Sequence, residues 1–279
     1  MRTILGTPAR AFDLRVVRLA HALLVTLPLA LVACSAASPL LIEPHAPAVG
    51  ELRLQTGGAA LVPVAGDDGA IAAARNAGSG PSAPQKVAAG VAEAAAIHPG
   101  VAPVVRAQIG AAPGLEASLR YGGRDLGLSG RWVFYDHRTE EAGATTLSLG
   151  LDGRALLAGR PADGMLPADA LVSGLHGGGG TLPFVLAWQS DAGLVSAYVG
   201  ALVGFDAAGG SVSGSLSGDA SVRRTFGAAT LGIGVGFRRV RAIVELGLER
   251  DWVHGAIADQ TVDLRLFSLA PAFALSVRL

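Results

Sequence analysis

The segment 226–248 alternates large apolar residues with small or polar ones, and this period of two constrains the fold more than any other feature. Leu231–Phe237 has a large apolar residue at every second position, with glycine between them. Val240–Leu248 is apolar on one face and carries Arg241 and Glu245 on the other. Successive side chains of a strand point to opposite faces, so the pattern predicts a β-hairpin with one apolar and one polar face.

The same alternation recurs from Glu51 to the end of the chain and predicts about ten strands, with eight or twelve as alternatives. Ten is an even number, as expected of bacterial single-chain barrels. We therefore predict an all-β fold, an antiparallel up-and-down transmembrane β-barrel with long external loops. The predicted long loops are 64–100, with a short helix at Pro84–Ile97, and 160–180, 207–220 and 251–260.

Three details favour a membrane barrel over a soluble one. Glycine alternates with large apolar residues, which suits a narrow lumen. Many strands reach 10–15 residues, enough for a tilted span of about 9–11. Aromatic residues such as Trp188 and Phe237 lie near strand ends, where membrane girdles occur. The alternative is a soluble, lipid-anchored β-barrel that binds a small apolar ligand inside.

Composition excludes other classes. Apolar residues make up 51% of the chain, yet beyond the N-terminus no uninterrupted apolar run reaches the length of a membrane helix. The formal net charge is zero and there is no basic block, so no nucleic-acid partner is predicted. The single cysteine, Cys34, excludes an intrachain disulfide.

The N-terminus has the pattern of an export signal. Four arginines flank or precede the apolar segment 19–33, which is too short to span a membrane, so residues 1–33 are predicted to be a signal peptide. Its end, Leu31-Val32-Ala33-Cys34, resembles the lipobox of bacterial lipoproteins. The resemblance implies that Cys34 is lipidated and becomes the mature N-terminus, and that the protein is exported to the outer membrane. An ordinary signal peptide, cut at Ala33 or Ala37, is the alternative.

The remaining chain divides into two parts. Residues 34–50 contain three prolines and are predicted to form an extended, lipidated tether. Residues 51–279 are predicted to form the barrel domain. Its last strand, apolar at every second position from Phe273 to Leu279, resembles the C-terminal signature strand of outer-membrane barrels, although those proteins typically end in phenylalanine.

Polar residues that alternate with the apolar face are predicted to point into the lumen. We expect a salt-bridge network that fills a narrow barrel; a polar path for small solutes is the functional alternative, and a general porin is not expected. The predicted lumen residues are Arg241, Glu245, Glu249, Arg265, Arg131 and Arg120.

No pattern predicts catalysis, a metal or a cofactor. The segment 176–180 (HGGGG) resembles the oxyanion loop of lipases and esterases, but no G-x-S-x-G nucleophile motif accompanies it, so a flexible loop is favoured and an outer-membrane hydrolase remains a weak alternative. The histidines His137 and His254, with acidic neighbours, are expected in solvated turns. The predicted protein is thus a non-enzymatic outer-membrane β-barrel lipoprotein, with a structural, envelope or surface-interaction role and outer-membrane lipids as its partners.

Overall fold

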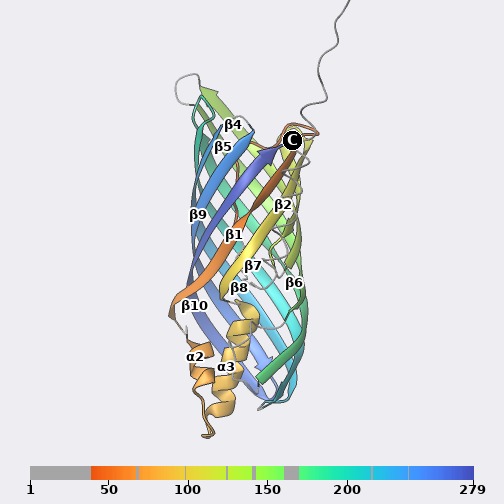
Figure 1. Cartoon of the computed structure of the whole chain (residues 1–279), viewed down its shortest axis with the longest axis vertical. Coiled ribbons are helices and arrows are strands. Elements are labelled where there is room, and N and C mark those ends of the chain that lie inside the picture. The colour runs from red at the N-terminus through yellow and green to blue at the C-terminus, as the bar shows by residue number, and fades with distance from the viewer. Residues whose placement is uncertain are drawn as a thin grey trace, which may run out of the picture. The chain divides into compact units, whose positions relative to one another are not determined.

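Ten antiparallel strands close into one barrel in which each strand pairs with its neighbours in the chain and β1 pairs with β10 (Figure 1). This confirms the predicted ten-stranded up-and-down architecture. The computed structural model describes residues 39–66, 69–97, 99–123, 125–139, 143–159, 170–214, 216–237 and 239–279. The strands are β1 (Leu52–Gly66), β2 (Gly100–Ala112), β3 (Leu115–Tyr121), β4 (Asp125–Thr139), β5 (Gly143–Gly159), β6 (Ala170–Gln189), β7 (Val195–Gly214), β8 (Gly218–Phe237), β9 (Val240–Ile257) and β10 (Gln260–Arg278). The helices are α2 (Ala70–Arg75) and α3 (Ala83–Ala96).

The two ends of the barrel differ. The start of β1 and the end of β10 lie at one end, which we call the terminal rim (Figure 1). The helices α2 and α3 lie at the opposite end, which we call the helix rim (Figure 1).

The outer surface is apolar from the terminal rim to about the middle of the tall strands. On β9 the outward residues of Val240–Leu248 are exposed, Val244 by 63%, whereas Arg241 and Glu245 are buried. A soluble barrel would point its apolar side chains inward. The nine residues of this apolar stretch also match the roughly 9–11 that a tilted strand needs to cross a hydrocarbon core. The predicted faces of this transmembrane-type barrel are therefore confirmed.

Toward the helix rim the apolar residues change faces. On β10, Phe273 and Leu275 point outward and are exposed, whereas Val262, Leu264 and Leu266 point inward and are buried. The pairing of β10 with β9 is unbroken across this change. Odd-numbered residues of β10 therefore point outward along the whole strand. What changes toward the helix rim is that the inward residues become apolar and the outward ones polar.

Unbroken pairing overturns two predictions. In the sequence, the apolar positions of the last strand change register near Phe267–Leu269, which predicts a β-bulge in β10. The pairing of β10 with β9 shows no such bulge, and the nearby register shift lies in β1, between Pro63 and Ala65. Arg265, predicted in the lumen, shares the parity of Phe267 and is exposed on the outer face. Its assignment to the lumen is wrong because the apolar residues around it are the inward ones.

Helix α3 explains the inward apolar residues. It packs against the inner faces of β8, β9 and β10, and Val87, Val91 and Ala95 on the helix are buried. The helix predicted at Pro84–Ile97 is thereby confirmed. No helix in the described ranges is long and apolar enough to cross a membrane. The strand residues in the same apolar core include Val222, Val253, Ile257, Val262, Leu264 and Leu266.

Two of the predicted long loops are largely strand, and so is the described part of a third. The segment 207–220 contains the end of β7 and the start of β8, and 251–260 contains the end of β9, a two-residue turn and the start of β10. The segment 160–180 contains the first half of β6, while 160–169 lies outside the described residues. The prediction of long loops is therefore wrong for 207–220, for 251–260 and for the described part of 160–180. These strand ends are polar outside and apolar inside, so they lack the pattern of the lipid-facing halves.

Glycines in the hairpin 226–248 make room inside the barrel. A Cβ at Gly232 would overlap the phenol ring of Tyr198, and one at Gly234 would crowd the Ser196 hydroxyl. The small residues between Leu231 and Phe237 are therefore set by packing in the lumen, as predicted.

The substitution Gly232→Ala is expected to lower the free energy of unfolding by about 1–3 kcal/mol, because it overpacks the ring of Tyr198. The measurement is the denaturant midpoint of the purified protein in detergent. Gly153→Ala on β5 is the control, since its added Cβ meets nothing within 4 Å. Equal midpoints for the two variants would contradict the packing role.

Candidate functional site: the filled lumen

The lumen beside the terminal rim is occupied by the segment 39–50, which precedes β1. Leu40, Leu41 and Ile42 are buried, and Val49 forms a parallel bridge with Gly110 of β2. The prediction of an extended external tether is therefore wrong for its described part. Residues 39–50 lie inside the barrel, bend at 44–45 and have a left-handed backbone at Leu41 (φ 43°).

Glu245 of β9 binds the backbone of this segment. Its carboxylate oxygens accept hydrogen bonds from the amides of Leu40 (2.9 Å) and Leu41 (2.8 Å). Tyr198 of β7 donates its hydroxyl to the same carboxylate. A buried amide without an acceptor costs about 1–3 kcal/mol, so Glu245 removes a large penalty for placing a peptide here.

Side chains of the barrel wall also bind the carbonyl oxygens of the segment. They come from β1, β2, β4 and β5, so the segment is held from several sides. Contacts to the backbone fix its path without depending on its side chains. The donor and carbonyl pairs are Arg106–Leu40 (2.7 Å), Gln55–Leu41 (3.2 Å), Arg131–Glu43 (2.9 Å), Thr146–Pro44 (3.0 Å) and Arg53–His45 (2.9 Å).

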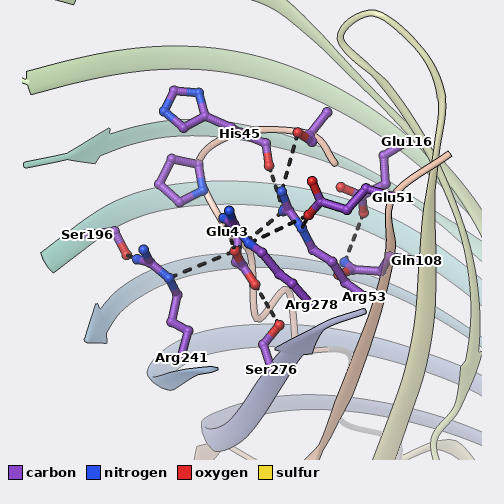
Figure 2. A network of polar contacts seen from close by, with 12 residues as sticks. Glu43, His45, Glu51, Arg53, Gln108, Glu116, Ser196, Arg241, Ser276 and Arg278 are labelled. Carbon is purple, nitrogen blue, oxygen red and sulfur yellow. Dashed lines mark hydrogen bonds and ion pairs between the residues drawn. The ribbon is translucent and has the colours of Figure 1, made fainter. Parts of the chain in front are cut away.

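Glu43 is the charged anchor of the segment at the terminal rim. Figure 2 shows its carboxylate among arginines from three strands. Its Oε2 lies 3.1 Å from Arg278 Nη2, 3.4 Å from Arg53 Nη1 and 3.8 Å from Arg241 Nε, and Ser276 donates to Oε1 at 2.6 Å. Burial raises the pKa of Glu43, but Arg53, Ser276 and Arg278 together outweigh burial and hold this pKa below its ordinary value.

A second buried network surrounds Arg224 of β8, nearer to α3. Its Nε lies 2.6 Å from Asp251 Oδ1 and its Nη1 3.2 Å from Asp206 Oδ2, and it also pairs with Glu249. The guanidinium carbon lies 4.2 Å from the ring centroid of Phe226. Buried charges are tolerated only when they are paired and hydrogen-bonded. For Arg224, three carboxylates and the aromatic ring of Phe226 provide these partners.

Arg154 of β5 extends this network over the inner face of β6. It forms a two-pronged ion pair with Asp206 of β7, at 2.8 and 2.7 Å. Gly179 of β6 lies against Asp206, where a Cβ would overlap the carboxylate. The glycines of 176–180 are therefore strand residues, and the predicted flexible loop is wrong. The backbone of this segment is paired with β5 and β7 in the sheet. This pairing gives no support to the resemblance to an oxyanion loop.

The structure separates the predicted lumen residues into distinct clusters. Glu245 and Arg131 hold the N-terminal segment, Arg241 belongs to the Glu43 cluster, and Glu249 belongs to the Arg224 network. Arg120 pairs with Asp125 at 3.1 Å and lies 3.7 Å from Asp152. All five point inward and are buried, whereas the sixth, Arg265, is outside.

Sequence reasoning missed the residues that centre the second network. Arg224 and Asp251 lie in or beside stretches predicted as loops, so their faces were not assigned. Continuing the alternation of β9 past Glu249 would have placed Asp251 on the same inner face. The alternation of inward and outward residues along β9 was therefore the sequence signal that could have identified Asp251 as an inward residue.

The described polar residues of the lumen pair with one another or with the N-terminal segment. No group of three or more histidine, cysteine or acidic side chains suited to a metal occurs in the part of the chain that the structure describes. Asp251 points inward and His254 outward, so these two do not form a site together. His45 of the N-terminal segment lies 3.2 Å from Asp136, at the terminal rim. The arrangement holds a peptide and neutralises charge.

The cavities of the lumen are small. One of about 10 Å³ separates α3 from Arg224, and one of about 50 Å³ lies beside Pro39. A cavity of about 240 Å³ opens at the terminal rim beside Arg241. Between the described parts of the N-terminal segment and α3, these spaces have room for waters. A cavity of about 840 Å³ lies elsewhere, among outward apolar residues such as Leu119, Leu128 and Leu151.

Comparisons with known proteins add little. No family model and no curated protein matches the chain. Among solved structures, Ail, the attachment invasion locus protein of Yersinia pestis, matches with 10% identity over 83% of this chain and 100% of its own, at a TM-score of 0.30. Two mutants of the Rh. blastica porin match with 6% and 5% identity over 82% of this chain and 99% of theirs, at TM-scores of 0.13. Likenesses of this level carry no information on function.

The substitution Glu245→Ala is expected to release the N-terminal segment, because the amides of Leu40 and Leu41 lose their acceptor. Hydrogen exchange of these amides should accelerate about tenfold or more, as a penalty above about 1.4 kcal/mol implies. Tyr198→Phe is the control, since it removes one donor and leaves both carboxylate oxygens. Unchanged exchange in Glu245→Ala would contradict the anchoring role.

Proposed function

We propose that this protein is a non-enzymatic β-barrel of the bacterial outer membrane, anchored additionally by lipid on Cys34. Its lumen is closed to solutes, and its role is structural or surface-directed, exerted through the part that extends beyond the membrane. The single observation behind this proposal is the filling of the lumen from both ends. A diffusion pore needs a continuous aqueous path, whereas here peptide and helix fill the barrel.

The orientation follows from the connections. Short turns, such as the one between β8 and β9, join strands at the terminal rim, while the long connection with α2 and α3 lies at the helix rim. Bacterial barrels have short periplasmic turns and longer external loops. The helix rim is therefore the external end in this proposal, and the tall strand ends of β6–β10 with α3 form the exposed platform.

The position of Pro39 supports lipidation of Cys34. Arg106 holds the carbonyl of Pro39 at 3.3 Å, and Arg106 lies six residues before the end of β2 at the terminal rim. Six strand residues tilted by about 40° rise about 15 Å along the barrel axis. The five residues from Cys34 to Pro39 span at most about 18 Å, so this length of chain is sufficient to bring Cys34 to the height of the terminal rim while the segment stays docked.

The native protein is expected to run faster on detergent gels unheated than heated, and to leave liposomes impermeable to small sugars. The first result follows from a stable barrel with an apolar outer belt, and the second from the filled lumen. Liposome swelling with arabinose is the measurement, and a known porin is the positive control. Identical mobility with and without heating would contradict the membrane barrel, and rapid swelling would contradict the closed lumen.

Cells given a radioactive fatty acid should label the native protein and not the Cys34→Ala variant. The expected reason is that the thiol of Cys34 and the new α-amino group are the acylation points of a lipobox cysteine. Ser35→Ala is the matched control and should label normally. Lipidation would be contradicted if the Cys34→Ala variant were labelled, or if the native protein were not labelled.

A further inference from the structure

Three arginines of the described strands face outward, and they lie together. They are Arg223 on β8, Arg250 on β9 and Arg265 on β10, and all three are exposed. The other arginines of the described strands face the lumen or lie at its terminal rim. The three outward arginines thus lie on three adjacent strands. We call this surface, with Trp252, the arginine patch.

The strand register brings these side chains close to one another. Trp252 lies directly opposite Arg265 on β10, and on the next rung His254 lies opposite Arg223 on β8. Directly paired residues of an antiparallel ladder have Cβ atoms about 4.5–5.5 Å apart, so long side chains from neighbouring rungs meet. The guanidinium carbon of Arg250 lies 5.2 Å from the ring centroid of Trp252 and is ordered by it.

The patch begins where the lipid-facing belt ends. On β9, Leu248 is the last apolar residue of the belt, and Arg250 is the next residue on the same face. On β8, Leu231 is exposed in the belt, and Arg223 lies further toward the helix rim on the same face. Tryptophan and arginine directly beyond the apolar belt mark the depth of lipid headgroups.

The charge of the patch is positive. Asp263 is the acidic side chain that faces it from β10, and it is paired with His254. A guanidinium group can donate two parallel hydrogen bonds to the oxygens of a phosphate. Several arginines close together at a membrane surface therefore favour the binding of an anionic lipid headgroup.

We propose that the arginine patch binds the phosphate of an anionic membrane lipid in the leaflet at the helix rim. The phosphate lies among Arg223, Arg250 and Arg265, and the acyl chains run along the belt past Leu248. This inference rests on the proposed function, because the patch lies at headgroup depth only if the belt is in a membrane.

The test uses the full-length protein purified in a zwitterionic detergent, first checked for its heat-dependent gel mobility. Native mass spectrometry then measures binding of dioleoyl phosphatidic acid and of dioleoyl phosphatidylcholine. The triple variant R223Q/R250Q/R265Q is compared with R138Q, an exposed arginine at the other rim. Each arginine near a membrane surface contributes about fivefold, so the triple variant should bind phosphatidic acid at least about tenfold more weakly. R138Q should bind like the native protein, and phosphatidylcholine binding should be the same in all three.

Equal binding of phosphatidic acid by the native protein and a folded triple variant would overturn the inference and leave the membrane barrel standing. Inorganic phosphate that binds the patch as tightly as phosphatidic acid would also overturn it, since the ligand would then be a free anion. If the triple variant does not fold, R250Q alone is measured and should bind about fivefold more weakly. Failure of the native protein to show heat-dependent mobility would instead contradict the membrane barrel itself.

Discussion

The apolar side chains of β8, β9 and β10 face outward over one half of each strand and face α3 over the other half. The hydrophobic effect requires that both sets leave water, and each half has a different partner. Near the terminal rim that partner is the apolar phase outside the barrel, and near the helix rim it is a helix of the chain itself. The exchange of faces therefore fixes the depth of the barrel, the place of α3 and the position of the first outward arginines.

The same exchange forces polar groups into the lumen of the lipid-facing half. Charges enclosed in a narrow barrel need partners, and unpaired ones cost several kcal/mol each. This chain supplies partners in two ways. Around Arg224 the partners are carboxylates of neighbouring strands, and around Glu245 they are the backbone amides of the chain's own N-terminal segment. The segment 39–50 is thus both a plug and a set of hydrogen-bonding groups that complete the wall.

These features make the two ends of the barrel unequal in function. The terminal rim has short turns and holds the buried Glu43 cluster. The helix rim has tall strands, a packed helix and an outward patch of arginine and tryptophan. In the function proposed above, the closed lumen leaves the outer surfaces to carry the role of the protein, and the arginine patch is the most distinctive of these surfaces.

The sequence by itself determined the lipid-facing halves of the strands. Alternation in the hairpin 226–248 places every outward valine and leucine, and also the inward Arg241 and Glu245, because a strand side chain's face depends only on its own parity. The helix at 84–97 followed from local propensity and its stop signals. Alternation and helix propensity were sufficient to predict an element wherever its outer face meets the same environment, lipid or solvent, along its whole length.

Tertiary structure decided everything that depends on a partner far away in the chain. Leu40 and Glu245 are 205 positions apart, so no local pattern showed that a proline-containing tether would enter the lumen. The strand ends 207–214 and 251–257 resembled loops because α3, not lipid, buries their apolar face. Arg265 was misplaced for the same reason. Parity fixes which side chains share a face, but only the assembled barrel decides whether that face meets lipid, water or another part of the chain.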